Sequence, residues 1–293
     1  MKKIRALLGF VRIHQWYKNI VVFLPLVFAL HLFLPKEFFI TMLGFVSLCL
    51  VSSSTYVRND ILDLERDKVH SIKRNRSLPS GLFTVNQAWV LFVVLISIGL
   101  ALSFVMSWKF TIMLVLLFVN TEIYSRWTKN IIFLDAFSIA ANFIIRAISG
   151  IILIGSKLSP WLILGIFFVA LFLGYTKRKA EVESLNEDAG IHRKVLKEYT
   201  PFSINSVVVI SAMMIIMTYS LYAIDGQSHD WRLVLTVPMV IFVIFRQLHL
   251  VSIKDTIAQT NEVFRDKQSG IGILVFLVVT IYLMYFAPAQ FFK

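Results

Sequence analysis

Long apolar runs separated by short polar segments recur along the whole chain. A run of about 20 apolar residues is long enough to cross the hydrocarbon core of a bilayer as an α-helix. Such runs lie at residues 19–35, 38–57, 87–107, 109–125, 131–154, 160–176, 202–224, 231–251 and 270–290. We therefore predict an all-α, polytopic membrane protein with about nine transmembrane helices.

Composition supports this prediction. Apolar residues make up 58% of the chain and charged residues only 16%, whereas soluble domains are about a quarter charged. No linker or low-complexity stretch interrupts the helices, so we expect one transmembrane domain covering residues 1–293. The longest polar connections, 58–86 and 177–201, exceed what a tether between spans needs, and each is expected to build structure of its own.

The basic residues predict how the chain is oriented. With nine spans and a cytoplasmic N-terminus, 22 of the 29 Lys and Arg residues fall on the cytoplasmic side, as the positive-inside rule requires. Both long connections then face the cytoplasm of a multi-pass protein in the cell (inner) membrane, surrounded by membrane lipids. The net charge of +12 follows from this topology, and we predict no nucleic-acid partner.

Several other function classes lack support. The basic, apolar N-terminus resembles a signal peptide, but no small-residue cleavage site follows, so we interpret it as the first helix. Cys49 is the only cysteine, which excludes an intramolecular disulfide. The six histidines show no metal-ligand spacing, and neither a P-loop nor a hydrolase elbow motif is present.

The most informative polar segment follows the second apolar run. It reads Asn59-Asp60-Ile61-Leu62-Asp63-Leu64-Glu65-Arg66-Asp67, and the basic residues Lys73, Arg74 and Arg76 come soon after it. Asp60, Asp63 and Asp67 stand at i, i+3 and i+7, so a helix would place their carboxylates on one face, with Asn59 beside them. Because like charges repel, this pattern indicates a divalent cation, and hard oxygen ligands favour Mg²⁺ that a substrate's phosphates also hold.

The second long connection begins with another charged helix end. Tyr175 and Lys179 stand four residues apart, as do Lys177 and Glu181, with Arg178 between them. These side chains can bind a phosphorylated ligand. The alternative is a solvated helix end laced with ion pairs.

A polar stripe runs along the fifth predicted span. Asp135, Ser138, Asn142 and Arg146 share one helix face, and charge within a membrane usually marks a water-filled cavity or a partner. The alternative is structural, with Asp135 and Arg146 each pairing with a neighbouring helix. Tyr124 and Lys129 lie at the cytoplasmic mouth of this span and fit either interpretation.

The pattern N-D-x-x-D-x-x-x-D resembles that of the UbiA superfamily of intramembrane prenyltransferases, and the similarity extends over nearly the whole chain. Further stretches are similar to the branch of decaprenyl-phosphate phosphoribosyltransferases. These are Arg12 to Asn19 with Lys18, His70 to Gly81, Tyr124 to Lys129, Asp135 to Arg146, and Ser159-Pro160-Trp161 leading to Lys177, Arg178 and Glu181.

The resemblance implies a UbiA-like helical bundle with cytoplasmic cap loops. It also implies Mg²⁺-dependent transfer of a 5-phosphoribosyl group from phosphoribosyl pyrophosphate to a polyprenyl phosphate such as decaprenyl phosphate. Asp60, Asp63 and Asp67 would be catalytic and would bind the metal, with Asn59 as a further ligand. The expected substrate-binding residues are Lys18, Asn59, Lys73, Arg74, Arg76, Tyr124, Lys129, Asn142, Arg146, Tyr175, Lys177, Arg178 and Glu181.

Two rival functions remain open. A UbiA-type prenyltransferase would use the same metal site to move a polyprenyl group from its diphosphate to an aromatic or other acceptor. The basic cluster Lys177-Arg178-Lys179, which stands where such enzymes carry a second Asp-rich motif, argues against it. A transporter is disfavoured because the sequence shows no convincing internal duplication. The oligomeric state is left open, a homo-oligomer included.

Overall fold

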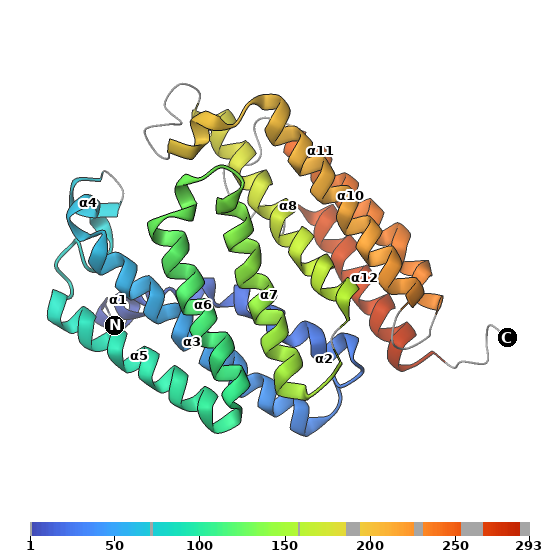
Figure 1. The fold of residues 1–293 in the computed structure, drawn as a ribbon, viewed down its shortest axis with the longest axis horizontal. Helices are drawn as coiled ribbons and strands as arrows, with labels where there is room; N and C mark the ends of the chain where they lie inside the picture. Colours follow the sequence, from blue (N-terminus) through green and yellow to red (C-terminus); the bar gives the residue numbers. More distant parts are fainter. Residues whose placement is uncertain are drawn as a thin grey trace. The chain divides into compact units, whose positions relative to one another are not determined.

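The computed structural model describes residues 2–70, 73–157, 159–185, 194–225, 231–252 and 266–287, and their regular structure is helical (Figure 1). The chain forms two compact units. Unit 1 comprises Met1–Arg126 and Ile145–Ser156, and unit 2 comprises Trp127–Ile144 and Lys157–Lys293. The single-domain prediction remains a prediction, because two packing units can belong to one domain.

Unit 1 contains most of the N-terminal helices. They are α1 (Lys2–Phe10), the 3₁₀ helix η1 (Ile13–Phe23), α2 (Leu24–Phe28), α3 (Pro35–Leu62), α4 (Leu64–Val69), η2 (Lys73–Asn75), α5 (Val85–Met106) and α6 (Trp108–Arg126). The C-terminal part of α7 (Leu134–Ile154) also belongs to this unit.

Unit 2 contains the N-terminal part of α7 and the helices that follow. They are η3 (Thr128–Asn130), α8 (Pro160–Leu185), η5 (Lys194–Glu198), α10 (Pro201–Asp225), η6 (Trp231–Thr236), α11 (Val237–Ser252) and α12 (Lys267–Tyr285).

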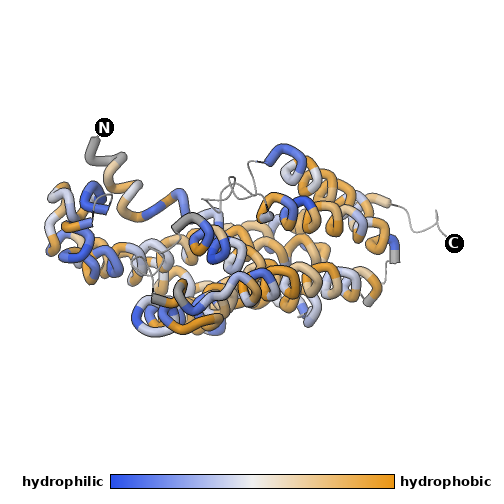
Figure 2. The backbone as a smooth tube through the Cα atoms, turned by 90° about the horizontal axis from the view of Figure 1, so that it is seen from above, coloured by the Kyte–Doolittle hydropathy of each residue, from blue (hydrophilic) through white to orange (hydrophobic). Residues whose placement is uncertain are grey.

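Among the described residues, seven helices are long and apolar enough to cross a membrane. Seven of the nine predicted runs correspond to them. The run 109–125 is also helical, as α6, but the polar residues Asn120, Thr121 and Glu122 near its end lower its mean hydropathy. Figure 2 shows that hydrophobic residues dominate the long helices. The protein is therefore a multi-pass integral membrane protein, while the count of nine is not reached.

The first predicted run, 19–35, is wrong as a single α-helix. The helical segment begins earlier, at Ile13, and is a 3₁₀ helix as far as Phe23 before five residues of α-helix end at Phe28. Because a 3₁₀ helix rises about 2.0 Å per residue, the segment is longer than an α-helix with the same number of residues. Apolar content alone does not distinguish these two helix types.

Close backbone contacts hold the helices of unit 1 together. The hydroxyl of Ser47 on α3 donates to the carbonyl of Gly99 on α5 (2.6 Å), and a Cβ at Gly99 would lie 2.8 Å from a methyl group of Val51. A Cβ at Gly150 of α7 would lie 2.2 Å from the carbonyl oxygen of Val22. Small residues at these crossings let helices approach closely, as is typical of membrane bundles.

The core of unit 2 forms between α7, α8, α10 and α11. Its buried members are Ala136, Ala140, Ala170, Leu171, Phe172, Tyr175, Val195, Tyr199, Ile204, Val208, Ala212, Ile215 and Ile244. On the outside, large apolar side chains such as Phe202 and Met213 of α10 are mostly exposed. An exposed apolar surface of this kind suits contact with lipid.

Candidate active site

The acidic segment lies where α3 gives way to α4. Asp63 is the C-cap of α3, and α4 begins at the next residue. The helical hydrogen-bond ladder nevertheless continues, since the Asp63 amide donates to the Asn59 carbonyl (2.9 Å) and the Asp67 amide to the Asp63 carbonyl (2.8 Å). Asn59, Asp63 and Asp67 therefore follow one another on successive turns, and Asp60 is displaced around the axis.

Asp60 is buried and has two arginine partners. Its Oδ1 accepts a hydrogen bond from Nη2 of Arg12 (2.5 Å), and Nη1 of Arg76 lies 3.4 Å from the same oxygen. The side chain of Asp60 is only 6% exposed. Burial of a carboxylate is tolerated when opposite charges compensate for the lost hydration, and the two guanidinium groups supply this charge.

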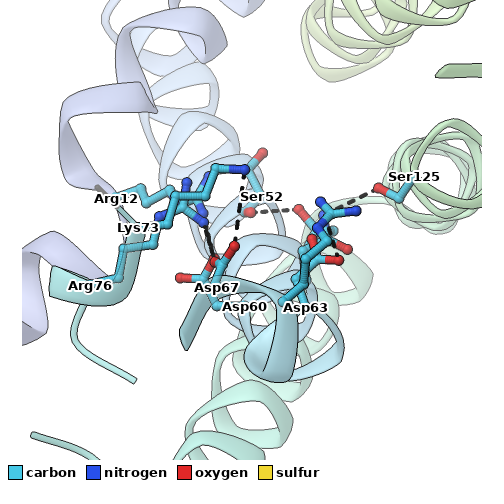
Figure 3. A network of polar contacts seen from close by, with 11 residues as sticks. Arg12, Ser52, Asp60, Asp63, Asp67, Lys73, Arg76 and Ser125 are labelled. Atoms are coloured by element: carbon cyan, nitrogen blue, oxygen red, sulfur yellow. Dashed lines mark hydrogen bonds and ion pairs between the residues drawn. The ribbon is translucent and has the colours of Figure 1, made fainter. Parts of the chain in front are cut away.

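Asp67 is also buried, and it shares Arg76 with Asp60. Nη1 of Arg76 donates to Oδ2 of Asp67 (2.7 Å), and the ammonium group of Lys73 lies 4.0 Å from Oδ1. Partial burial lowers the pKa of Lys73, and the charge of Asp67 opposes this shift. Figure 3 shows Arg12, Lys73 and Arg76 gathered beside Asp60 and Asp67. Two carboxylates and three cations form the polar centre of this site.

Asp63 lies apart from this centre (Figure 3). Its side chain is 40% exposed, and its ion pair with Arg66 is long, at 3.7 Å. Asn59 donates to the hydroxyl of Ser125 on α6 (3.2 Å). In the part of the chain that the structure describes, no three Asp, Glu, His or Cys side chains converge closely enough to hold a metal ion, so a shared metal at Asp60, Asp63 and Asp67 stays a prediction.

The donor set nevertheless fits Mg²⁺. Magnesium is usually held in proteins by one or two carboxylates together with waters and substrate phosphates. Asp67 and Asp63, with the amide oxygen of Asn59, offer hard oxygen ligands on consecutive turns. Asp60 is the weaker candidate, because it is displaced around the helix axis from Asn59, Asp63 and Asp67.

A buried ion pair supports this site from α6. Arg58, next to Asn59, pairs with Glu122, and both side chains are largely buried, at 15% and 12% exposed. Arg126 lies 3.6 Å from the same carboxylate but is 52% exposed. Together with the contact between Asn59 and Ser125, the pair holds the end of α3 against α6.

In unit 2, Arg178 belongs to a second buried network. Its Nε lies 2.8 Å from Oδ2 of Asp135, and it also pairs with Glu181. The Tyr199 hydroxyl donates to Oδ1 of Asp135 (3.2 Å), and burial, with the charge of Asp135 adding to it, raises the pKa of this hydroxyl. Asp135 therefore pairs with a neighbouring helix, α8. A substrate-binding role for Arg178 and Glu181 remains a prediction. Lys179, which is buried, forms an ion pair with Glu183 one turn further along α8 (3.8 Å).

Arg146 also pairs with a neighbouring element. Its Nε donates to Oδ1 of Asn19 on η1 (2.7 Å), and the residue is buried. Each end of the polar stripe thus pairs with another element. A substrate-binding role for Arg146 remains a prediction. Ser138, between the two ends, donates to the hydroxyl oxygen of Thr128 (2.8 Å).

The remaining predicted site residues are distributed over both units. In unit 1, Lys18 lies on η1 next to the Tyr17 ring, Arg74 is exposed on η2, and Tyr124 is partly buried on α6. In unit 2, Lys129 and Asn142 are partly buried on η3 and α7, and Tyr175 and Lys177 lie on α8, with Tyr175 buried. A substrate-binding role for these residues remains a prediction. Residues 186–193 of the second long connection lie outside the described residues.

Three residues of the site did not emerge from sequence reasoning: Arg12 as the partner of Asp60, Glu122 as the partner of Arg58, and Ser125 as the partner of Asn59. Each contact joins residues far apart in the chain, so no spacing rule predicts it. The one available signal was a charged or polar residue near the end of an apolar run, which is also where the positive-inside rule places charge.

Comparison with known proteins identifies the family of the chain. The model of the UbiA prenyltransferase family matches residues 20–267. The chain belongs to this family. A decaprenyl-phosphate phosphoribosyltransferase from Corynebacterium glutamicum is 30% identical over 244 residues, which cover 80% of this chain and 73% of the relative. The enzyme of the same name from Mycolicibacterium smegmatis is 27% identical over 256 residues, covering 82% and 80%.

The fold is that of the UbiA family as well. A UbiA homologue from Archaeoglobus fulgidus, solved bound to GPP and Mg²⁺, superposes with a TM-score of 0.73 at 14% sequence identity. The match covers 95% of this chain and 99% of the homologue. This UbiA-family protein is therefore a membrane transferase with an all-α fold.

Proposed function

We propose that this protein transfers a 5-phosphoribosyl group from phosphoribosyl pyrophosphate to a polyprenyl phosphate, such as decaprenyl phosphate, at the cytoplasmic face of the cell membrane. The observation that carries the proposal is the similarity to decaprenyl-phosphate phosphoribosyltransferases along 80% of the chain. The buried carboxylates and the three cations beside them are chemically suited to a diphosphate donor.

The proposed cation-binding residues are Asp63 and Asp67, with Asn59 beside them. A bound Mg²⁺ would neutralise charge on the pyrophosphate as it leaves. Lys73 and Arg76 would hold donor phosphate oxygens from the opposite side, because a guanidinium group and an ammonium group both donate hydrogen bonds to phosphate. Arg74, exposed on η2, would contact the donor from solvent.

The reaction needs little further assistance. The C1–O bond to pyrophosphate breaks and pyrophosphate leaves with the bonding electrons, so C1 gains oxocarbenium character while a phosphate oxygen of the lipid forms a new bond to it. Because the acceptor is already an anion, no strong general base is required. A site with several cations, and with no cluster of histidines among the described residues, is consistent with this chemistry.

Prenyl transfer is the second candidate. It is supported by the family, whose name describes this reaction, and by the GPP and Mg²⁺ bound to the Archaeoglobus homologue. Both reactions release pyrophosphate and would use the same acidic segment. They differ in which part of the donor reaches the acceptor.

A labelled-donor assay separates the two. Purified protein is incubated with Mg²⁺, polyprenyl phosphate and phosphoribosyl pyrophosphate labelled in the ribose. We expect the label to enter the organic phase, and EDTA to prevent this. A second incubation contains a polyprenyl diphosphate and an aromatic acceptor in place of these two substrates. If the ribose label stays in water in the first incubation and the polyprenyl diphosphate is consumed in the second, prenyl transfer is the activity.

A further inference from the structure

Arg12 lies in the short connection between α1 and η1 and has an unusual backbone. Its φ and ψ angles are 52° and 49°, in the left-handed region. Residues with a Cβ rarely adopt this conformation, because the Cβ crowds a carbonyl oxygen, and glycine would adopt it more easily. An arginine here indicates that the side chain has a purpose that offsets the strain.

Contacts on both sides of Arg12 fix this connection to α3. The hydroxyl of Ser53 donates to the carbonyl of Val11 (2.7 Å) and accepts a hydrogen bond from the indole of Trp16 (3.0 Å). The guanidinium group of Arg12 lies 4.8 Å from the centre of the Tyr56 ring. These contacts hold the guanidinium group in place at Asp60.

Arg12 and Arg76 compete for one carboxylate oxygen. Oδ1 of Asp60 is 2.5 Å from Arg12 and 3.4 Å from Arg76, whereas the same nitrogen of Arg76 is 2.7 Å from Asp67. Arg12 thus neutralises most of the charge on Asp60. Without it, Asp60 would attract Arg76 more strongly and draw it away from Asp67.

Arg76 is the most exposed member of this group, followed closely by Lys73 at 34%. The side chain of Arg76 is 37% exposed, whereas those of Asp60 and Asp67 are 6% and 1% exposed. The contact with Asp60 therefore helps to determine the direction in which the remaining N–H groups of Arg76 point.

We propose that Arg12 is a positioning residue, which acts through Asp60 to orient Arg76 toward the phosphates of the donor. On this view Asp60 serves the site as an anchor for two arginines and does not bind the metal. The inference rests on the proposed use of a diphosphate donor, but it holds equally for phosphoribosyl and prenyl donors, because both contain the same leaving group.

The test compares R12Q, D60N and the double variant with the wild type. Two dissociation constants are measured in detergent: that of Mn²⁺ alone, followed by electron paramagnetic resonance as a stand-in for Mg²⁺, and that of pyrophosphate at saturating Mg²⁺. R12K preserves the charge and serves as a second, milder variant. K68Q is the matched control, since Lys68 forms an exposed ion pair with Glu65 (2.7 Å) in the same segment.

We expect R12Q and D60N each to weaken pyrophosphate binding by roughly tenfold, as is typical when a supporting partner of a binding residue is lost. The double variant should be no weaker than either single variant, because both act through Arg76. R12K should lose less than R12Q, and K68Q should match the wild type. The Mn²⁺ constant should stay within about twofold of the wild type in all of them, because none of the substituted residues is a proposed metal ligand.

Three results would overturn the proposal. If R12Q and R12K both fold and both bind pyrophosphate as tightly as the wild type, Arg12 is a purely structural counter-ion. A large loss of Mn²⁺ affinity in D60N but not in R12Q would make Asp60 a metal ligand. Wild-type protein that does not bind pyrophosphate would remove the site. None of these depends on whether the wild type makes a ribosylated lipid.

Discussion

At the scale of single residues, Asp67 is the carboxylate on which the site depends most. It is 1% exposed, contacts both Arg76 and Lys73, and follows Asp63 and Asn59 on successive turns. In the proposed reaction it would both bind the cation and organise the basic residues that hold the donor.

We therefore expect D67N to lower kcat/KM by at least about a hundredfold, equivalent to ~2.7 kcal/mol of transition-state stabilisation. The measurement is the rate of labelled-lipid formation, with gel filtration to show that the variant is folded. E65Q is the control, because Glu65 is 82% exposed in the same helix and should leave the rate unchanged. A D67N variant with more than about a tenth of the wild-type rate would contradict a role in metal or donor binding.

The acidic segment also shows what residue spacing can predict. The helical spacing of the acidic residues correctly indicates that residues 59–67 follow a helical path. The position of Lys73 and Arg76 soon after this segment correctly indicates that basic side chains lie beside it. The helical spacing also predicts that Asp60, Asp63 and Asp67 share one face, whereas Asp63 lies apart from the others. The reason is that α3 ends at Leu62 and that Arg12 and Arg76, both from outside the segment, gather around Asp60 and Asp67.

At the scale of helices, the ion pair between Arg58 and Glu122 joins α3 to α6 next to Asn59. We expect E122Q to lower the free energy of unfolding by about 3 kcal/mol, because it leaves the buried guanidinium group of Arg58 without its carboxylate. R126Q is the control, since Arg126 is exposed and farther from Glu122, and it should cost less than about 1 kcal/mol.

The measurement is unfolding in mixed detergent micelles. Equal losses in E122Q and R126Q would show that the buried pair contributes nothing beyond a surface ion pair. Loss of activity in E122Q at full stability would place Glu122 in the chemistry itself.

Apolar runs predicted most of the helices well. The run 38–57 is α3 and the run 87–107 is α5, each within a few residues at both ends except where α3 continues into the acidic segment. The segment 19–35 was less predictable, because the choice of a 3₁₀ helix and its end at Phe28 depends on packing, such as that of Val22 against Gly150. Contacts of this kind are not visible in composition.

At the scale of the whole molecule, the orientation in the membrane is still a prediction, and a cysteine experiment tests it. Cys49 is fully buried, so the wild type should not react with a membrane-impermeant maleimide. We expect E65C to be labelled only after the membrane is permeabilised, and K36C to be labelled in intact cells. Labelling of E65C in intact cells would place the acidic segment on the outer face and contradict a cytoplasmic site.

The proposed reaction itself is tested most directly by following both parts of the donor. Phosphoribosyl pyrophosphate carries one label in the ribose and another in the β-phosphate, and the wild type is given Mg²⁺ and polyprenyl phosphate. We expect the ribose label to enter the lipid in the same molar amount as the phosphate label appears in water as pyrophosphate. A lipid fraction without ribose label, under conditions in which the protein cleaves a polyprenyl diphosphate, would contradict phosphoribosyl transfer.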